Sequence, residues 1–385
     1  MRYTDDSLYP ENMSPLIITA APYGPTWLPG DAEDIAVTWD EQVQAAVDCY
    51  NAGATVLHFH VRDPETGHLS ADIEHYNYLL GRVKKAVPKM IMQVGGSIAF
   101  SPKSDGAKAE WLDYDTRHML AELQPTPETV TVAIGTSMMD LTQMWTADDI
   151  KGTHMEDPKV MAQYAGMFTD AGPGFYLEHL KRLKKAGIQP YFTLAHVHQL
   201  EIVERLIRRG VYMGPLNTNI TTYGGGGCGN NPYDWMHWLS REPQGAVVTF
   251  WAAMRVAAVA EPLAIILGQH VRVGIEDNLW NSKRERMTTI QQIEAVVSLT
   301  ERFGRPVATA EEARKIMKIG VWYDSVDETL KNLGMPPNTA GDGKGFTVFE
   351  TDGKKTSQHA MSDSHPIPTA AAKKSAAAKK AKAAA

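Results

Sequence analysis

The chain has 385 residues, of which 43% are hydrophobic, enough for one large core or two modest ones. It has no run of 18 apolar residues, so we expect no membrane span. Its polar, acidic start lacks the apolar core of a signal peptide, and its only cysteines are Cys49 and Cys228, so we expect a cytoplasmic location. The net charge is −7, but the lysine-rich residues 370–385 leave 33 basic and 45 acidic residues elsewhere, a net charge of −12 that argues against nucleic-acid binding.

Short apolar segments rich in β-branched residues alternate with helical patterns through most of the chain. Between them, Thr38 and Glu41 form a capping box that predicts the start of a helix, and Thr309 and Glu312 predict another. Apolar residues three or four apart precede Gly187, Gly210 and Gly304, which predicts helices that end there. Eight segments are predicted to be strands: 15–21, 55–61, 89–95, 129–135, 190–196, 212–218, 246–254 and 271–277.

Eight strands that alternate with helices predict parallel pairing and a (β/α)8 TIM barrel, with an open doubly wound sheet as the alternative. The glycine run in YGGGGCGNNP, residues 223–232, lacks the spacing of a dinucleotide fingerprint and does not favour that alternative. We therefore expect four regions along the chain: an N-terminal arm at 1–14, the catalytic barrel at 15–317, a packed extension at 318–350 and a disordered Ala/Lys tail at 351–385.

The segment VLHFHVRD places His58 and His60 two residues apart on a predicted strand, so both imidazoles should point to the same side. The predicted eighth strand, HVRVGIEDN, carries Arg272 and ends in Glu276 and Asp277. In a barrel, the second and eighth strands both flank the first, so their carboxyl ends can converge. Two imidazoles and one carboxylate are the three-ligand set of a catalytic zinc.

Other interpretations of these residues stay open. The two histidines can be core residues bonded to carbonyl groups, Arg272 can hold a structural ion pair, and Asp277 can cap a helix. A second pair, His196 and His198 in LAHVHQ, suggests a metal-dependent hydrolase of the amidohydrolase type that uses both pairs. A third possibility is a barrel that binds a small ligand without turnover.

The segments PLIITAAPYG, AGATVLHFHVRDPETG, GQHVRVGIEDN and GRPVATAEEAR occur in the order of four motifs of the β-keto acid cleavage enzymes. The chain resembles this family, typified by 3-keto-5-aminohexanoate cleavage enzyme, over roughly residues 15–315. The resemblance implies a (β/α)8 barrel and a zinc enzyme, often a homotetramer, which condenses a β-keto acid with acetyl-CoA and releases acetoacetate and a new acyl-CoA. It also implies site residues: His58, His60 and Glu276 as zinc ligands, Asp277 and Arg272 in proton transfer, and Thr136 and Arg255 in substrate binding.

The chemistry is consistent with these residue types. A β-keto acid can chelate one metal through its ketone and carboxylate oxygens, and a zinc ion would lower the pKa of the C2 protons. A general base is then needed, and Asp277 can serve, with the guanidinium of Arg272 as its partner.

The sequence departs from the family motifs at positions expected to contact substrate. Thr26 stands where members that act on amino-bearing keto acids carry a glutamate, so we expect no recognition of a cationic amine through this residue. Gly96 and Ser97 stand in a VGGS segment in place of the usual S-T-G-G, and Arg255 lies in AAMR in place of GIGR. We therefore expect an altered substrate. The glycines at 224–227 can approach CoA phosphates or form a flexible loop.

Overall fold

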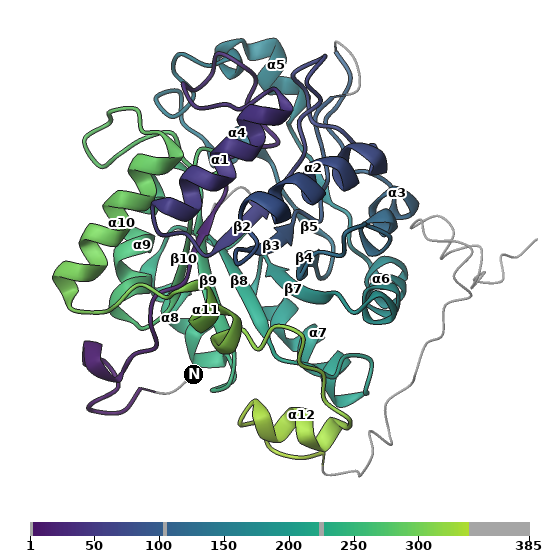
Figure 1. Cartoon of the computed structure of the whole chain (residues 1–385), viewed down its shortest axis with the longest axis vertical. Coiled ribbons are helices and arrows are strands. Elements are labelled where there is room, and N and C mark those ends of the chain that lie inside the picture. The colour runs from purple at the N-terminus through teal and green to yellow at the C-terminus, as the bar shows by residue number, and fades with distance from the viewer. Residues whose placement is uncertain (1–2, 103–105, 223–226, 339–385) are drawn as a thin grey trace, which may run out of the picture.

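The computed structural model describes residues 3–102, 106–222 and 227–338 (Figure 1). Eight parallel strands form a closed barrel in the order β1-β10-β9-β8-β7-β4-β3-β2. The predicted (β/α)8 barrel is confirmed, and the open-sheet alternative is wrong. The barrel strands are β1 (Ile18–Ala20), β2 (Val56–Phe59), β3 (Ile91–Val94), β4 (Thr129–Ala133), β7 (Gln189–Leu194), β8 (Asn217–Thr222), β9 (Val247–Ala252) and β10 (His270–Val273).

Helices surround the barrel, and their ends follow the predicted signals. Thr38 and Glu41 form both hydrogen bonds of a capping box at the start of α1, and Thr309 and Glu312 do the same at α11. Gly187 and Gly304 adopt left-handed conformations at the ends of α6 and α10. The helices are α1 (Trp39–Asn51), α2 (Ile73–Ala86), α3 (Tyr114–His118), α4 (Leu141–Met144), α5 (Pro158–Gln163), α6 (Pro173–Ala186), α7 (Val197–Arg208), α8 (Pro232–Arg241), α9 (Ala257–Ile266), α10 (Thr289–Phe303), α11 (Ala310–Ile316) and α12 (Val326–Asn332), with short 3-10 turns at Pro10–Asn12, Met119–Ala121, His154–Glu156 and Met254–Val256.

Two predicted strand boundaries need correction. The sixth barrel strand was predicted at 212–218 but lies at Asn217–Thr222, in the polar sequence NTNITT. Its side chains are nevertheless all buried, because residues on one face point into a polar barrel interior while Ile220 packs under the helices. The fifth barrel strand ends at Leu194, so His196 lies after the strand, where it precedes α7.

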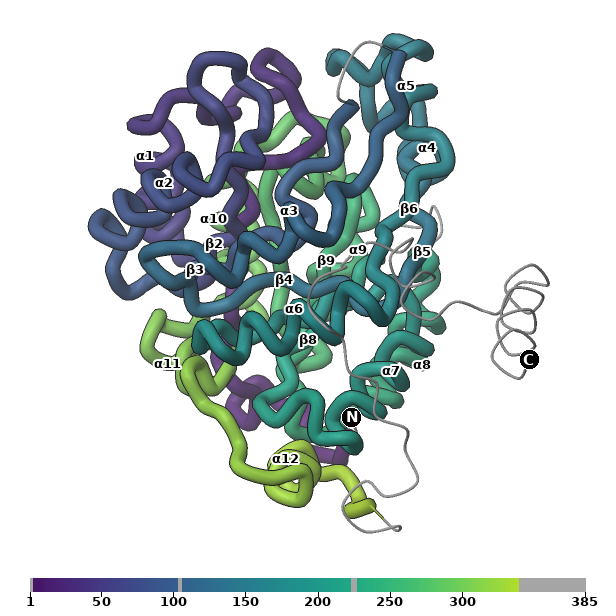
Figure 2. The backbone as a smooth tube through the Cα atoms, turned by 90° about the vertical axis from the view of Figure 1, so that its right-hand side faces the viewer, coloured from purple at the N-terminus to yellow at the C-terminus, as the bar shows by residue number. Residues whose placement is uncertain are grey.

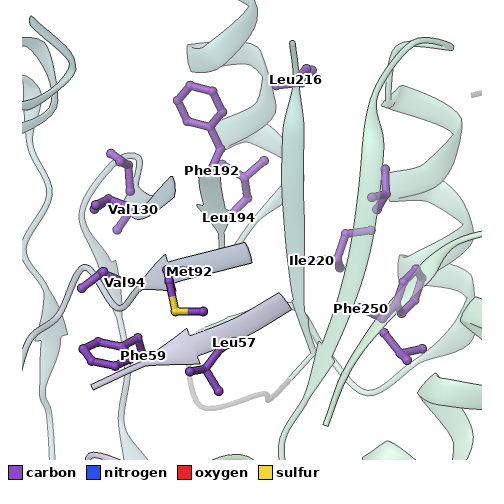
Figure 3. Packing of buried hydrophobic residues seen from close by; sticks show 14 of the residues in the cluster. Leu57, Phe59, Met92, Val94, Val130, Phe192, Leu194, Leu216, Ile220 and Phe250 are labelled. Atoms are coloured by element: carbon purple, nitrogen blue, oxygen red, sulfur yellow. The ribbon is translucent and has the colours of Figure 1, made fainter. Parts of the chain in front are cut away.

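Side chains of the strands alternate between two cores. Leu57 and Phe59 of β2 point outward into the layer between strands and helices, together with Met92 and Val94 of β3 (Figure 3). Val56 belongs instead to a smaller cluster with Ile17, Ile91, Tyr191, Ala308, Ala313 and Met317. Residues of α11 and its flanks therefore close one end of the barrel. Alternation along β2 then requires that His58 point inward.

The connection between β4 and α6 is much longer than the others and covers the opposite end of the barrel. It contains β5 (Ser137–Met138), paired antiparallel with β6 (Phe168–Thr169), as well as α4 and α5. Figure 2 shows α4 and α5 at one end of the molecule and α12 at the other. This connection, residues 134–172, is called the β4–α6 excursion below.

Three side-chain contacts fix the β4–α6 excursion to loops that follow other strands. His154 Nδ1 lies 2.5 Å from Asp31 Oδ2, in the loop after β1. Arg255 Nε, after β9, donates to Asp149 Oδ1 at 2.7 Å. Trp280 Nε1, after β10, donates to the Asp149 carbonyl oxygen at 2.7 Å. The excursion is thus held over the barrel mouth.

Some predictions concern residues that the structure does not describe. The predicted Ala/Lys tail, residues 339–350 of the predicted extension and three of the four glycines at 224–227 lie outside the described residues. Among the described residues, no helix combines the length and apolar character needed to cross a bilayer.

Candidate active site

His58, His60 and Glu276 form one buried cluster at the mouth of the barrel. The Nε2 atoms of His58 and His60 are 3.2 Å apart, and they lie 3.3 and 3.8 Å from Glu276 Oε1. Because β1 pairs with both β2 and β10, the predicted convergence of these strands is observed. Ligand atoms bound tetrahedrally at 2.0–2.1 Å from an ion are about 3.3 Å apart, so the observed separations suit such an ion.

Neighbouring groups orient both imidazoles. His58 Nδ1 lies 2.9 Å from Gln93 Oε1, and His60 Nδ1 lies 2.9 Å from the carbonyl oxygen of Ile98. Since both partners are acceptors here, each imidazole carries its proton on Nδ1 and presents the lone pair of Nε2 to the cluster. These outer contacts were not found from the sequence.

Gly95 leaves the space that His60 occupies. A Cβ atom built at this position would lie 2.2 Å from His60 Nε2. At the next residue, a Cβ on Gly96 would lie 2.0 Å from the carbonyl oxygen of Thr131 on β4. Gly95 therefore lets the chain after β3 pass directly against His60, and Gly96 lets it pass against β4.

The protonation states suit metal binding. Burial lowers the pKa of His60 to about 4, which keeps its imidazole neutral near pH 7. Burial alone would raise the pKa of Glu276, but Arg272 and the two histidines outweigh it and hold that pKa well below its usual range. Within the described residues, Glu276 Oε2 is buried and accepts no hydrogen bond. A buried oxygen without a partner is costly, and a bound cation would satisfy it.

Arg272 connects the cluster to Asp277. Its Nε and Nη2 donate to the two carboxylate oxygens of Asp277, each at 2.7 Å, and Nη2 also donates to Glu276 Oε1 at 2.5 Å. Its guanidinium carbon lies 4.9 Å from the centroid of a Trp251 ring. Burial raises the pKa of Asp277 to about 6, although Arg272 opposes the increase. This places a carboxylate that can exchange protons near neutral pH next to the cluster.

The remaining predicted site residues divide into two groups. Thr26, Gly96 and Ser97 line the cavity that also contains the cluster. Thr136 and Arg255 are not among the residues that line it. The Thr136 hydroxyl is exposed and accepts a hydrogen bond from the Ala171 amide at 3.2 Å, whereas Arg255 makes the ion pair with the β4–α6 excursion given above.

His196 and His198 do not join the cluster. Their rings stack on each other with centroids 5.1 Å apart at the start of α7, and neither lines the cavity. Among the residues that the structure describes, His58, His60 and Glu276 form the one group of three or more side chains positioned to share a metal ion. The hydrolase alternative therefore lacks its second pair of ligands.

The cavity encloses about 940 Å³ of empty space, a volume that includes its opening to solvent. The cluster of His58, His60 and Glu276 lies in one part of its wall. Large apolar side chains form another part, and sequence patterns did not single them out, because most lie in loops and in the β4–α6 excursion. They are Phe100, Trp111, Met139, Leu141, Met144 and Trp145.

Comparisons with known proteins agree with this geometry. The family model of the β-keto acid cleavage enzymes matches residues 15–319. The chain is 27% identical over 313 residues to 3-keto-5-aminohexanoate cleavage enzyme of Acetoanaerobium sticklandii, covering 80% of this chain and 99% of that one. It is 23% identical to 3-dehydrocarnitine:acetyl-CoA trimethylamine transferase of Rhizobium meliloti, covering 79% and 96%. A solved structure of ObcA in a binary complex with oxaloacetate shares the fold, with a TM-score of 0.54 at 14% identity, over 75% of this chain and 68% of that one.

Proposed function

The chain belongs to the β-keto acid cleavage enzyme family, and from this premise we propose that it is a zinc-dependent enzyme that condenses a β-keto acid with acetyl-CoA and releases acetoacetate plus a new acyl-CoA. The observation that carries the proposal is the buried cluster of His58, His60 and Glu276. The names of relatives that use acetyl-CoA support the choice of co-substrate.

His58, His60 and Glu276 would hold the metal through two Nε2 atoms and one carboxylate. A zinc ion bound there would supply Lewis acidity toward the ketone and carboxylate oxygens of the substrate. Gln93 and Ile98 keep the imidazoles in the tautomer that binds metal.

Asp277 is the proposed base. It accepts a proton from C2 of the β-keto acid, and the electron pair left at C2 forms a bond to the acetyl carbon while the carbon–sulfur bond of acetyl-CoA breaks. The thiolate then bonds to the original ketone carbon, the bond between that carbon and C2 breaks, and C2 takes back a proton. Arg272 holds the base through two hydrogen bonds, which keep its carboxylate oriented throughout.

Other residues of the cavity wall would contact the substrate. Gly96 and Ser97 would contact the substrate from the end of β3, and Thr26 from the loop after β1, since all three line the cavity. Thr136 and Arg255 would need to act from outside this cavity wall.

We also propose that the enzyme is a homotetramer, which light scattering of the purified protein would test.

The experiment measures acetoacetate release with acetyl-CoA from a panel of neutral, anionic and cationic β-keto acids, with zinc quantified on the same sample. Release from one substrate class, lost in His58→Ala and retained in the exposed control His198→Ala, is the expected result. A protein that contains zinc but releases no acetoacetate from any substrate would contradict the proposal.

A further inference from the structure

We propose that the enzyme selects β-keto acids whose side chain beyond the ketone is uncharged and apolar. The inference rests on the proposed function and names the substrate class of the same site. It depends on the chemistry of the cavity wall beyond the metal cluster.

The first observation is where charge lies in the cavity. Among the described residues that line it, the ionisable side chains are His58, His60, Arg272, Glu276 and Asp277, all within the cluster. The other lining residues are apolar, hydroxyl-bearing or amide side chains and glycines, including Thr26. A charged group on the substrate side chain would thus lose its hydration in this part of the cavity and meet no opposite charge there, which is costly.

The second observation is the composition of the apolar wall. Phe100 and Trp111 stack at 6.5 Å with an interplanar angle of 10°. Met139 and Met144 add flexible thioether side chains. The indole nitrogen of Trp111 is buried, as is that of Trp145, so these two rings present carbon to the cavity.

Aromatic walls can also attract a quaternary ammonium group, but these rings are already engaged. The buried guanidinium of Arg117 lies 5.3 Å from the centroid of a Trp111 ring, and Arg272 lies over Trp251. Trp27 stacks on Trp145 at 5.0 Å and does not line the cavity. A second cation next to Trp111 or Trp251 would be repelled by the first, so the wall suits neutral groups.

The names of two relatives refer to substrates with an amino group and a trimethylamine group, both cationic. The uncharged wall of this chain suits a different, neutral side chain. A neutral, apolar side chain binds more favourably when the cavity wall removes it from water. Each methylene buried against the wall is expected to raise kcat/KM about fourfold until the available space is filled.

The test compares kcat/KM for acetyl-CoA-dependent acetoacetate release from five probes. The neutral probes are 3-oxohexanoate and 3-oxooctanoate; the charged probes are 3-oxoadipate, 5-amino-3-oxohexanoate and 3-dehydrocarnitine. We expect the neutral probes to exceed every charged probe at least 100-fold and the longer one to exceed the shorter. A charged probe that equals or exceeds the neutral ones would overturn this inference but leave the proposed function intact. Failure of every probe would overturn the proposed function, and this inference with it.

A pair of variants tests the wall directly. Met144→Glu places a carboxylate in the cavity, whereas Met138→Glu places one on β5 at an exposed position outside it. We expect Met144→Glu to lower kcat/KM for 3-oxooctanoate at least tenfold and to raise it for 5-amino-3-oxohexanoate, with zinc content unchanged, and Met138→Glu to change neither. If Met144→Glu does not fold, Met144→Gln is expected to show the loss without the gain. Equal effects of the carboxylate inside and outside the cavity would contradict the inference.

Discussion

The contact between Gly95 and His60 allows a sharp test of the proposed metal site. In Gly95→Ala the new Cβ would lie 2.2 Å from His60 Nε2 and 2.3 Å from Cε1, whereas ordinary contacts begin near 3.4 Å. The imidazole would have to move by about 1 Å, roughly twice the ~0.5 Å within which a binding constellation must be held. This movement would also strain the hydrogen bond of Nδ1 to Ile98.

Because one ligand is displaced, we expect Gly95→Ala to weaken zinc binding by about 10- to 100-fold and to lower kcat/KM by about 100-fold or more. Zinc affinity is measured by competition with a chelator, and folding by thermal melting. The matched control is Gly81→Ala within α2, where the nearest atom is Pro125 Cδ at an ordinary 3.6 Å. This control should bind zinc normally and be more stable by about 0.5–1 kcal/mol. Unchanged zinc affinity in Gly95→Ala would refute the proposed role of His60.

Three further predictions follow from neighbouring contacts and from a distant buried acid. Gln93→Leu removes the acceptor of the His58 Nδ1 proton, so zinc affinity in the same competition assay should fall about 10- to 100-fold. Arg272→Lys cannot form two parallel hydrogen bonds to Asp277, so kcat/KM should fall at least about 100-fold while zinc content stays at one per chain; equal loss of zinc would indicate a role in metal binding instead. Burial raises the pKa of Glu242 to about 7. The folded state therefore keeps a proton on this carboxyl up to about pH 7, whereas the unfolded state releases it above about pH 4.3. The free energy of unfolding thus falls as the pH rises from about 4.3 through 7. Glu242→Gln should therefore raise the free energy of unfolding at pH 8 by up to about 4 kcal/mol and have little effect at pH 4, as measured by urea denaturation. A gain that does not depend on pH would contradict this explanation.

The parts of the fold that were predictable follow simple periodicities. Alternation along VLHFHV sends Leu57 and Phe59 to the outer core and both histidines inward, so the ligand pair was visible in the sequence. The strand at 217–222 was misplaced because a search for apolar segments misses a strand whose inward face meets a polar interior.

The outer contacts of the cluster were less accessible to sequence reasoning. The acceptor for His60 is a backbone carbonyl, that of Ile98, which adopts a positive φ of 61°. A carbonyl position depends on the path of the loop rather than on residue type. The same holds for Trp111 and Trp145, which reach the cavity from irregular segments distant in the sequence. Propensity and periodicity carry no information about such approaches.

The division of the cavity between separate chain segments has a consequence for how such an enzyme can diverge. The proposed metal ligands come from β2, from the residue after it and from the turn after β10, and their support comes from β3 and the loop that follows it. Met139, Met144 and Trp145 come from the β4–α6 excursion, which is attached to the barrel mouth by side-chain contacts such as Arg255 to Asp149. Exchange of the excursion would thus change this part of the cavity wall while the segments that carry the proposed ligands stay unaltered, so replacement of one loop offers a route to a new substrate preference.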